Sequence, residues 1–219
     1  GPYGGMDQKL LSFALADVPR YTSYPTAVQF ENGFSPVLAD RWIAELPEEA
    51  SLSVYVHIPF CRQLCWYCGC HTSVPNSYER AARYVDVLVK DIARTAGLMT
   101  RRGQRVKHLH FGGGTPTYLD DFHIGAVLEA VDKGFGLASG AEVALESDPR
   151  TLTTARAKAL TGMGFNRISF GVQDFALPVQ MKINRLQTFG LVATATEFLR
   201  AAGFTSVNFD LMYGLPGQT

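Results

Sequence analysis

The chain has 219 residues, with 20 lysines and arginines balanced by 20 aspartates and glutamates, and 47% of its residues are hydrophobic. This length and composition allow one sizeable buried core. The net charge of zero disfavours nucleic acid as a partner, because phosphate binding requires a clustered basic surface. The sequence contains no run of about 18 or more apolar residues, so it predicts no membrane-spanning helix. No signal peptide is recognisable, so we expect a cytoplasmic protein.

The first fifty residues are expected to precede the main domain. Residues 1–5 (GPYGG) look like the scar of recombinant expression, and residues 6–50 like an N-terminal arm with helices, before a domain over residues 51–219. The elements expected in the arm are a short helix over Met6–Ala16, an extended ordered segment over Val18–Phe30 and a helix within Phe34–Leu46.

From residue 51 onward, β-rich runs alternate with helical patterns. The predicted strands are Leu52–Ile58, Val106–Phe111, Ala141–Leu145, Arg167–Gly171 and Ser206–Leu211. The predicted helices carry apolar residues over Ala81–Ile92, Ile124–Val131, Leu152–Met163 and Phe189–Ala202. Asn76 and Glu79 have the spacing of a capping box at the start of the first of these helices. Because strand and helix alternate five times without a hairpin turn, the sequence predicts an α/β fold with a parallel sheet and right-handed crossovers.

All four cysteines of the chain lie close together, at Cys61, Cys65, Cys68 and Cys70. They could form disulfides, share a zinc ion or hold an iron–sulfur cluster. The spacing C-x3-C-x2-C lets three thiolates each reach a different iron of a [4Fe–4S] cluster, which leaves the fourth iron open to another ligand. Zinc sites usually draw their ligands from two separated knuckles, and a reducing compartment disfavours disulfides. The cluster is therefore favoured, with zinc and disulfides as the alternatives.

Polar residues and glycines gather where the predicted strands end. The cysteines follow the first strand, Gly112–Gly114 the second, Glu146 the third, Gln173 the fourth and Asp210 the fifth. Parallel βα units place functional residues at the carboxyl ends of their strands, so these residues predict one site. The glycine turn by itself could also bind a phosphate, although it lacks the lysine of a P-loop and the spacing of a dinucleotide site.

Two further predictions follow from the same strand pattern. Tyr55 and His57 lie two residues apart in the first strand and should face the same side of the sheet. The basic run Arg101–Lys107 precedes the second strand, so we expect it on the opposite rim as solvated surface.

Five stretches of sequence carry a family resemblance. They are PRYTSYPTA at Pro19–Ala27, YVHIPFC at Tyr55–Cys61, CGC at Cys68–Cys70, HFGGGTPTYL at His110–Leu119 and DLMYGLPGQT at Asp210–Thr219. The chain thereby resembles the oxygen-independent coproporphyrinogen III oxidases, also called coproporphyrinogen dehydrogenases, of the radical S-adenosylmethionine (SAM) superfamily. This resemblance implies a partial (β/α) barrel, truncated here after about five βα units. Because the family's sequences are longer and carry a C-terminal domain, we expect the chain to be an N-terminal fragment.

The resemblance also implies roles for individual residues. Cys61, Cys65 and Cys68 would bind a [4Fe–4S] cluster whose open iron holds SAM. The residues implied at the first SAM are Tyr55, Tyr67, Gly113 and Glu146. Those implied at a second SAM are Gly114, Thr115, Gln173, Arg185 and Asp210. Cys70 and His57 are the candidate catalytic residues, each with the alternative of a structural side chain.

The activity implied is the oxidative decarboxylation of two propionate side chains of coproporphyrinogen III to vinyl groups, which gives protoporphyrinogen IX in haem biosynthesis. The implied partners are this substrate and an unidentified electron donor and acceptor, with neither nucleic acid nor membrane, and the protein is expected to be a monomer. One alternative is a haem-trafficking chaperone of the same superfamily, disfavoured by Cys70 and by the segment Pro19–Pro25. The other is a structural zinc protein.

Overall fold

The computed structural model describes residues 35–62, 72–99, 105–173, 175–182, 188–211 and 218. Two units can be separated, Gly1–Arg41 and Trp42–Thr219, and their boundary falls within helix α2 (Pro36–Ala44). This helix confirms the one expected within Phe34–Leu46, although it is shorter. The elements expected before it lie outside the described residues, and the proposed domain limits at residues 5 and 50 stay predictions.

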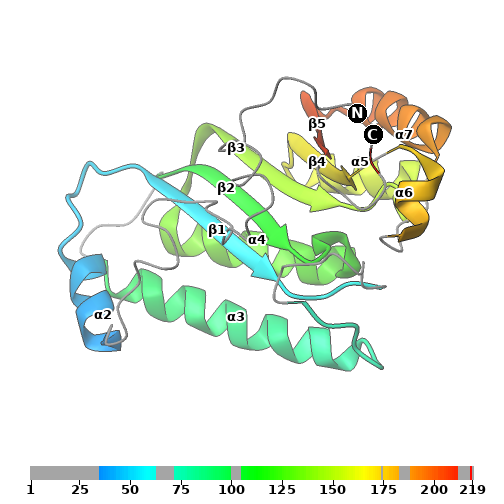
Figure 1. The fold of residues 1–219 in the computed structure, drawn as a ribbon. Coiled ribbons are helices and arrows are strands. Elements are labelled where there is room, and N and C mark those ends of the chain that lie inside the picture. The colour runs from blue at the N-terminus through cyan, green and yellow to red at the C-terminus, as the bar shows by residue number, and fades with distance from the viewer. Residues whose placement is uncertain are drawn as a thin grey trace, which may run out of the picture. The chain divides into compact units, whose positions relative to one another are not determined.

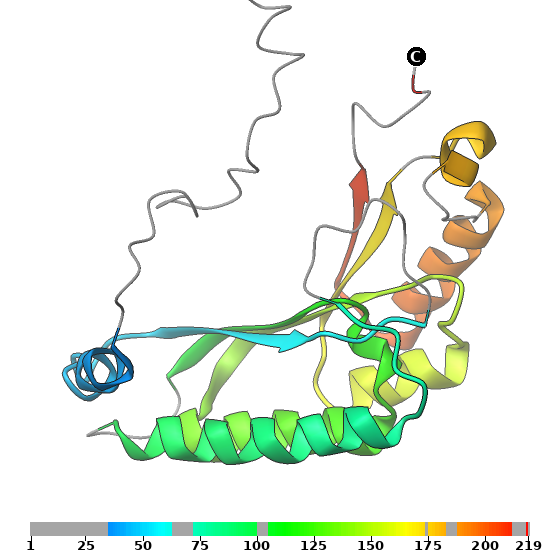
Figure 2. The ribbon, with the colours of Figure 1, turned by 60° about the horizontal axis from the view of Figure 1, so that its bottom comes forward.

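The second unit is built on a parallel sheet of five strands in the order β1-β2-β3-β4-β5. The strands are β1 (Leu52–Ile58), β2 (Val106–Gly113), β3 (Leu137–Ser147), β4 (Arg167–Gln173) and β5 (Ser206–Leu211). Since each strand pairs with the next one in the chain, every right-handed crossover returns on the same side of the sheet. Figures 1 and 2 show the major crossover helices on one face of a curved sheet. The predicted α/β fold with a parallel sheet is confirmed.

The helices of this unit follow the expected alternation. They are α3 (Glu79–Gly97), the 3-10 turn η2 (Pro116–Tyr118), α4 (Asp121–Phe135), α5 (Thr154–Gly162), α6 (Leu177–Lys182) and α7 (Phe189–Ala202). Three of them begin at side chains that accept a backbone N–H three residues on, namely Asp120, Thr153 and Thr188. The short elements η2 and α6 were not predicted.

The expected capping box at Asn76 is wrong. Helix α3 begins later, with Tyr78 as its N-cap residue, and no side chain caps it. Glu79, which the capping box needed to reach back to the cap, instead pairs with Arg83 one turn along the helix, at 2.8 Å. Asn76 lies in a bend before the helix, so the spacing in the sequence did not correspond to the start of the helix.

Alternate residues of each strand build the core. Val56 and Ile58 of β1, like Phe111 of β2, are buried and belong to the same apolar cluster as Val85 of α3 and Val127 of α4. Because side chains alternate along a strand, the residues between them lie on the opposite face. That opposite face is not covered by the crossover helices (Figure 2). Many of the residues on it are polar.

One part of the basic run was predicted wrongly. Arg105 is buried, with 6% of its surface exposed, instead of lying in solvent. Its guanidinium donates from Nε to the carbonyl of Ala50 at 3.0 Å and from Nη2 to that of Pro47 at 2.7 Å. Burial of a charged group is tolerated where carbonyl oxygens replace water as its hydrogen-bond partners. Lys107 is exposed, as expected, and residues 101–104 lie outside the described part.

Candidate functional site

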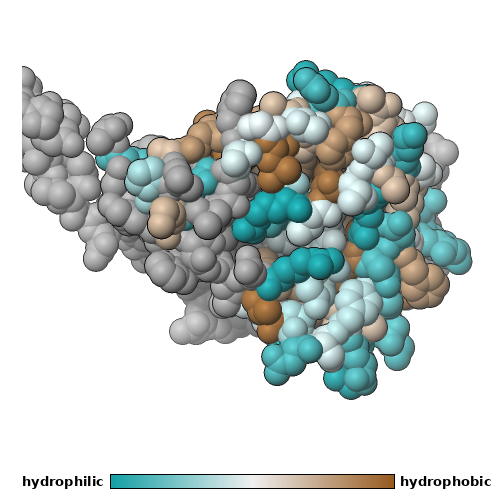
Figure 3. Space-filling view, turned by 90° about the vertical axis from the view of Figure 1, so that its right-hand side faces the viewer, coloured by the Kyte–Doolittle hydropathy of each residue, from teal (hydrophilic) through white to brown (hydrophobic). Residues whose placement is uncertain are grey.

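The candidate site is the polar face of the sheet, on the side away from the crossover helices. Its residues come from alternate positions of all five strands, and those with polar side chains include Tyr55, His57, His108, His110, Glu142, Glu146, Arg167, Gln173, Asn208 and Asp210. Figure 3 looks onto the side toward which β1 and β2 point in Figure 1, where hydrophilic and hydrophobic residues are interspersed. Five strands thus bring to one surface residues that are up to about 150 positions apart in the chain.

Tyr55 and His57 lie on the same face, as predicted. The Tyr55 hydroxyl is 3.3 Å from His57 Nδ1, and the Tyr55 ring stacks on His110 at a centroid distance of 5.8 Å. His110 is the register partner of Tyr55 on β2, and its Nε2 lies 3.2 Å from Glu146 Oε1 on β3. Three strands therefore contribute to one connected polar cluster. Tyr55 keeps 58% of its surface exposed, so the cluster is accessible.

The glycine turn packs tightly against this cluster. A methyl group at Gly112 would lie 2.7 Å from the Tyr55 ring and 3.0 Å from Glu146 Oε1, and one at Gly113 would lie 2.7 Å from the His57 ring. Gly113 also has φ of +114°, which favours glycine, and its N–H donates to Glu146 Oε2 at 3.2 Å. The glycines are needed here because their neighbours occupy the space of a side chain.

The same turn also reaches the first cysteine. A methyl group at Gly114 would lie 2.6 Å from the Phe60 carbonyl oxygen and 2.9 Å from Cys61 Sγ. Gly114 N–H donates to the carbonyl of Ile58, and Thr115 N–H to that of Phe60, so the turn extends the pairing of β2 with β1. The Thr115 hydroxyl is 3.5 Å from Cys61 Sγ, a distance suited to a weak hydrogen bond. A thiolate ligand with such an outer partner is typical of metal sites.

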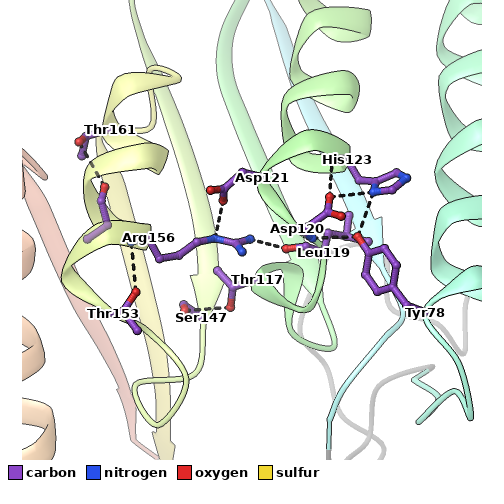
Figure 4. Close-up of polar contacts among 11 residues, drawn as sticks. Tyr78, Thr117, Leu119, Asp120, Asp121, His123, Ser147, Thr153, Arg156 and Thr161 are labelled. Carbon is purple, nitrogen blue, oxygen red and sulfur yellow. Dashed lines mark hydrogen bonds and ion pairs between the residues drawn. The ribbon is translucent and has the colours of Figure 1, made fainter.

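The segment after the glycine turn is held by polar contacts (Figure 4). Thr117 Oγ1 lies 3.0 Å from Ser147 Oγ at the end of β3. Arg156 of α5 donates from Nη2 to the carbonyl of Leu119. Its Nε lies 2.7 Å from Asp121 Oδ1, an ion pair in which the N–H is not aligned for a hydrogen bond. These contacts connect the segment after the glycine turn to the end of β3 and to α5.

Gln173 and Asp210 complete the rim at β4 and β5. Gln173 has φ of +72°, and among the residues described it alone adopts positive φ without being glycine. Such a conformation costs about 1 kcal/mol or more and is concentrated at functional sites. Partial burial raises the pKa of the Asp210 carboxyl, the charge of Glu146 raises it further, and His110 opposes both. The negative charges of Glu146 and Asp210 therefore repel each other across the site. A pair of carboxylates in this arrangement suits a cationic or hydroxyl-bearing ligand.

The structure describes most, but not all, of the predicted site residues. Tyr55, His57, Cys61, Gly113, Gly114, Thr115, Glu146, Gln173 and Asp210 lie along the polar face or its rim. Cys65, Tyr67, Cys68, Cys70 and Arg185 lie outside the described residues. For this reason the cluster ligand set is a prediction, and within the described ranges no group of three metal-ligating side chains occurs.

His110 was missed by the sequence interpretation. It lies two residues before Gly112 on β2, so period-two alternation places it on the same face as the glycine turn. Its register with Tyr55 and its contact with Glu146 make it central to the polar cluster. The alternation of side chains along the strand could have shown which face His110 occupies. Its contacts with Tyr55 and Glu146 depend on how the strands are paired.

The residues present fit the cofactors that the sequence implies. Cys61 offers a half-buried thiol next to a turn without side chains, and Glu146 presents a carboxylate that is already oriented by Gly113 and His110. Thiolate suits a soft iron site, and a carboxylate can accept hydrogen bonds from an ammonium group or from ribose hydroxyls.

Within the described residues no helix is long and apolar enough to cross a membrane.

Comparison with known proteins agrees with this geometry. The profile of the radical SAM superfamily matches residues 55–219. Oxygen-independent coproporphyrinogen III oxidase from Bradyrhizobium diazoefficiens is 45% identical over 95% of this chain and 46% of its own length. The protein of the same name from Escherichia coli is 43% identical over 92% of this chain and 43% of its own length.

A solved structure gives the same picture. Coproporphyrinogen III oxidase from Escherichia coli, described as a radical SAM enzyme, superposes with a TM-score of 0.84 at 39% identity and covers 97% of this chain and 47% of its own. The chain thus spans about half the length of the relatives that it matches. Its matched profile covers most of its residues, and the chain belongs to the radical SAM superfamily.

Proposed function

We propose that this chain is the cofactor-binding part of an oxygen-independent coproporphyrinogen III oxidase. The proposed reaction is the oxidative decarboxylation of two propionate side chains to vinyl groups, from coproporphyrinogen III to protoporphyrinogen IX in haem biosynthesis. The observation that carries the proposal is the packing of Gly114 against Cys61 and of Gly112 and Gly113 against Tyr55 and His57. The relatives of this name, at 43–45% identity, support the choice of substrate.

The proposed cofactors are a [4Fe–4S] cluster and SAM. Cys61, together with Cys65 and Cys68, would bind the cluster through thiolates, and the turn Gly112–Gly114 would lie along SAM. When bound, the two cofactors supply a carbon-centred radical able to abstract a hydrogen atom from the substrate. A second SAM bound by Gly114, Thr115, Gln173, Arg185 and Asp210 is the finer form of this proposal.

The described residues would orient SAM and exclude water. Glu146 already accepts the N–H of Gly113 and lies against His110, so it needs little rearrangement to accept a hydrogen bond from SAM. Tyr55 presents its ring and hydroxyl beside Gly112, where it would limit the position of the ligand. His57, held within reach of the Tyr55 hydroxyl, is the proposed residue for holding or moving a proton there.

The remaining partners are proposals of the same kind. Cys70 is proposed to act on the substrate and not on the cluster. The electron donor and the acceptor are separate proteins or small molecules, and the protein is proposed to act as a cytoplasmic monomer without nucleic acid or membrane.

The test is an anaerobic reconstitution followed by product analysis. The reconstituted chain is expected to hold close to four irons and, with dithionite, to cleave SAM to 5′-deoxyadenosine. Coproporphyrinogen III should give vinyl products in a form of the protein that spans the full length of its relatives. Stoichiometric zinc without iron would instead support a structural metal site and overturn the proposal.

A further inference from the structure

We propose that the groove between the end of β1 and the start of α3 is the docking surface for a small acidic electron-transfer protein, which reduces the cluster. The proposal rests on the proposed function, because it requires a cluster at Cys61. The groove has a volume of about 560 Å³, and its lining includes Phe60, Ser73, Arg80, Arg83, Tyr84 and Val87.

The first observation is the short covalent and hydrogen-bonded connection from the groove to the cysteine. Phe60 lines the groove and directly precedes Cys61 in the chain. The Cys61 N–H donates to the carbonyl of Ser73, another lining residue, at 3.0 Å. Electron transfer slows steeply with distance, so a donor should dock where the cluster is closest to the surface. A donor in this groove would be one residue, or one hydrogen bond, from a cluster ligand.

The second observation is the charge of the groove. Its described lining includes Arg80 and Arg83 and neither aspartate nor glutamate. Within the described part of the chain, Arg80 makes no hydrogen bond or ion pair, and Arg83 pairs only with the exposed Glu79, where both side chains are about 70% exposed. Such an exposed pair contributes little stability, so an incoming carboxylate can replace it at little cost. A partner with acidic side chains fits this surface.

The third observation is that the surface combines arginine with apolar and aromatic groups. Val87 is 65% exposed beside Tyr84, and the floor is the buried ring of Phe60, which packs edge-on against Tyr84 at 5.4 Å. Arginine and aromatic residues are enriched in protein interfaces, and transient redox partners bury small areas. A groove of this size, with an exposed apolar rim, suits a brief protein encounter.

The start of α3 is held firmly, so the arginines are presented at defined positions. Tyr78, immediately before the helix, accepts the N–H of Asp120 at 2.9 Å and lies 3.0 Å from His123 Nδ1 (Figure 4). Its ring also stacks on Tyr118, which in turn contacts Phe60. The tyrosine that holds the helix is thus connected by ring contacts to the floor of the groove. A preorganised surface reduces the entropic cost of docking.

The test compares two reductants on the reconstituted cluster under anaerobic conditions. Reduced flavodoxin, an acidic flavin protein, serves as the protein donor, and dithionite as the small reductant that needs no docking surface. The variant is Arg80→Glu with Arg83→Glu. The control is Lys90→Glu with Arg94→Glu, which makes the same charge change on the same helix at exposed positions outside the groove lining. Stopped-flow absorbance gives the rates, and sedimentation with oxidised flavodoxin gives the bound fraction.

The groove variant should be reduced by flavodoxin at least about tenfold more slowly than the parent and should bind it more weakly, because like charges oppose docking. Its iron content and its reduction by dithionite should equal those of the parent, and the control should stay within about twofold. The parent's rate with flavodoxin should fall as salt is added.

Equal rates in the groove variant and the parent would overturn the proposal, as would equal slowing in the control. A parent cluster that dithionite reduces and flavodoxin does not would also overturn it. These outcomes differ from a failure of the proposed function, in which the parent holds no iron or gives no 5′-deoxyadenosine with dithionite.

Discussion

Replacement of Gly114 by alanine tests the packing on which the candidate site depends. The added methyl group would lie 2.6 Å from the carbonyl oxygen of Phe60 and 2.9 Å from Cys61 Sγ. Two of its three nearest atoms are backbone atoms of Phe60, so they cannot move aside by a side-chain rotation. The backbone around Phe60, just after β1, must shift away from the turn, and Cys61 shifts with it.

The magnitude follows from the cost of overpacking. Inserting a methyl group into a tightly packed position costs about 1–3 kcal/mol. For a chain of this size, about 2 kcal/mol lowers the melting temperature by about 4–8 °C. Cys61 would also be displaced relative to the other proposed cluster ligands, so the reconstituted Gly114→Ala protein should hold less iron than the parent and cleave SAM more slowly.

The matched control is Gly125→Ala in α4. An added methyl group there has no atom within 4 Å, and the residue lies inside a helix, where alanine is favoured over glycine by about 0.5–1 kcal/mol. This variant should melt slightly higher than the parent and bind iron equally well. Melting of the metal-free proteins by circular dichroism separates the packing cost from any effect of the cofactor. A Gly114→Ala protein that melts within about 1 °C of the parent and holds the same iron would refute the reasoning.

Three further predictions use other parts of the site. Cys61→Ser should lose the cluster, because an alkoxide is a poor ligand for soft iron, whereas Cys70→Ser should keep the parent's iron content. Iron analysis measures both, and a colourless Cys70→Ser protein would contradict the proposed ligand set. Burial and the charge of Glu146 raise the pKa of the Asp210 carboxyl in the folded chain, so the stability that the protonated carboxyl contributes is lost as pH rises through that pKa. Asp210→Asn should therefore raise the melting temperature more at pH 7 than at pH 4. An equal rise at both pH values would count against the electrostatic coupling of Asp210 to Glu146. Burial raises the pKa of Tyr78 to about 12 from 10.0, so between these pH values the phenol stays protonated in the folded chain and ionises in the unfolded chain. The urea concentration at the unfolding midpoint should therefore fall between pH 10 and pH 12, and it should fall less steeply in Tyr78→Phe. Equal pH dependence of this midpoint in the parent and the variant would argue against the raised pKa.

The alternation of elements was readable from the sequence alone. Strands β1 and β5 and helix α7 have the predicted bounds, because period-two and helical patterns of apolar residues are local properties of the chain. The gathering of Glu146, Gln173 and Asp210 on one face also followed, since parallel strands bring their carboxyl ends to one rim. The superfamily was recognisable for the same reason, because its motifs lie in short continuous stretches.

Other features were decided only by tertiary structure. Arg105 is buried because carbonyl groups of Pro47 and Ala50, more than fifty residues earlier, replace its water. His110 became a site residue because the strand register sets it against Tyr55. The fit of Gly114 against Cys61 likewise depends on how two strands separated by about fifty residues pair. Sequence periodicity specifies which face a residue occupies, but the contact itself depends on the register and packing of distant segments.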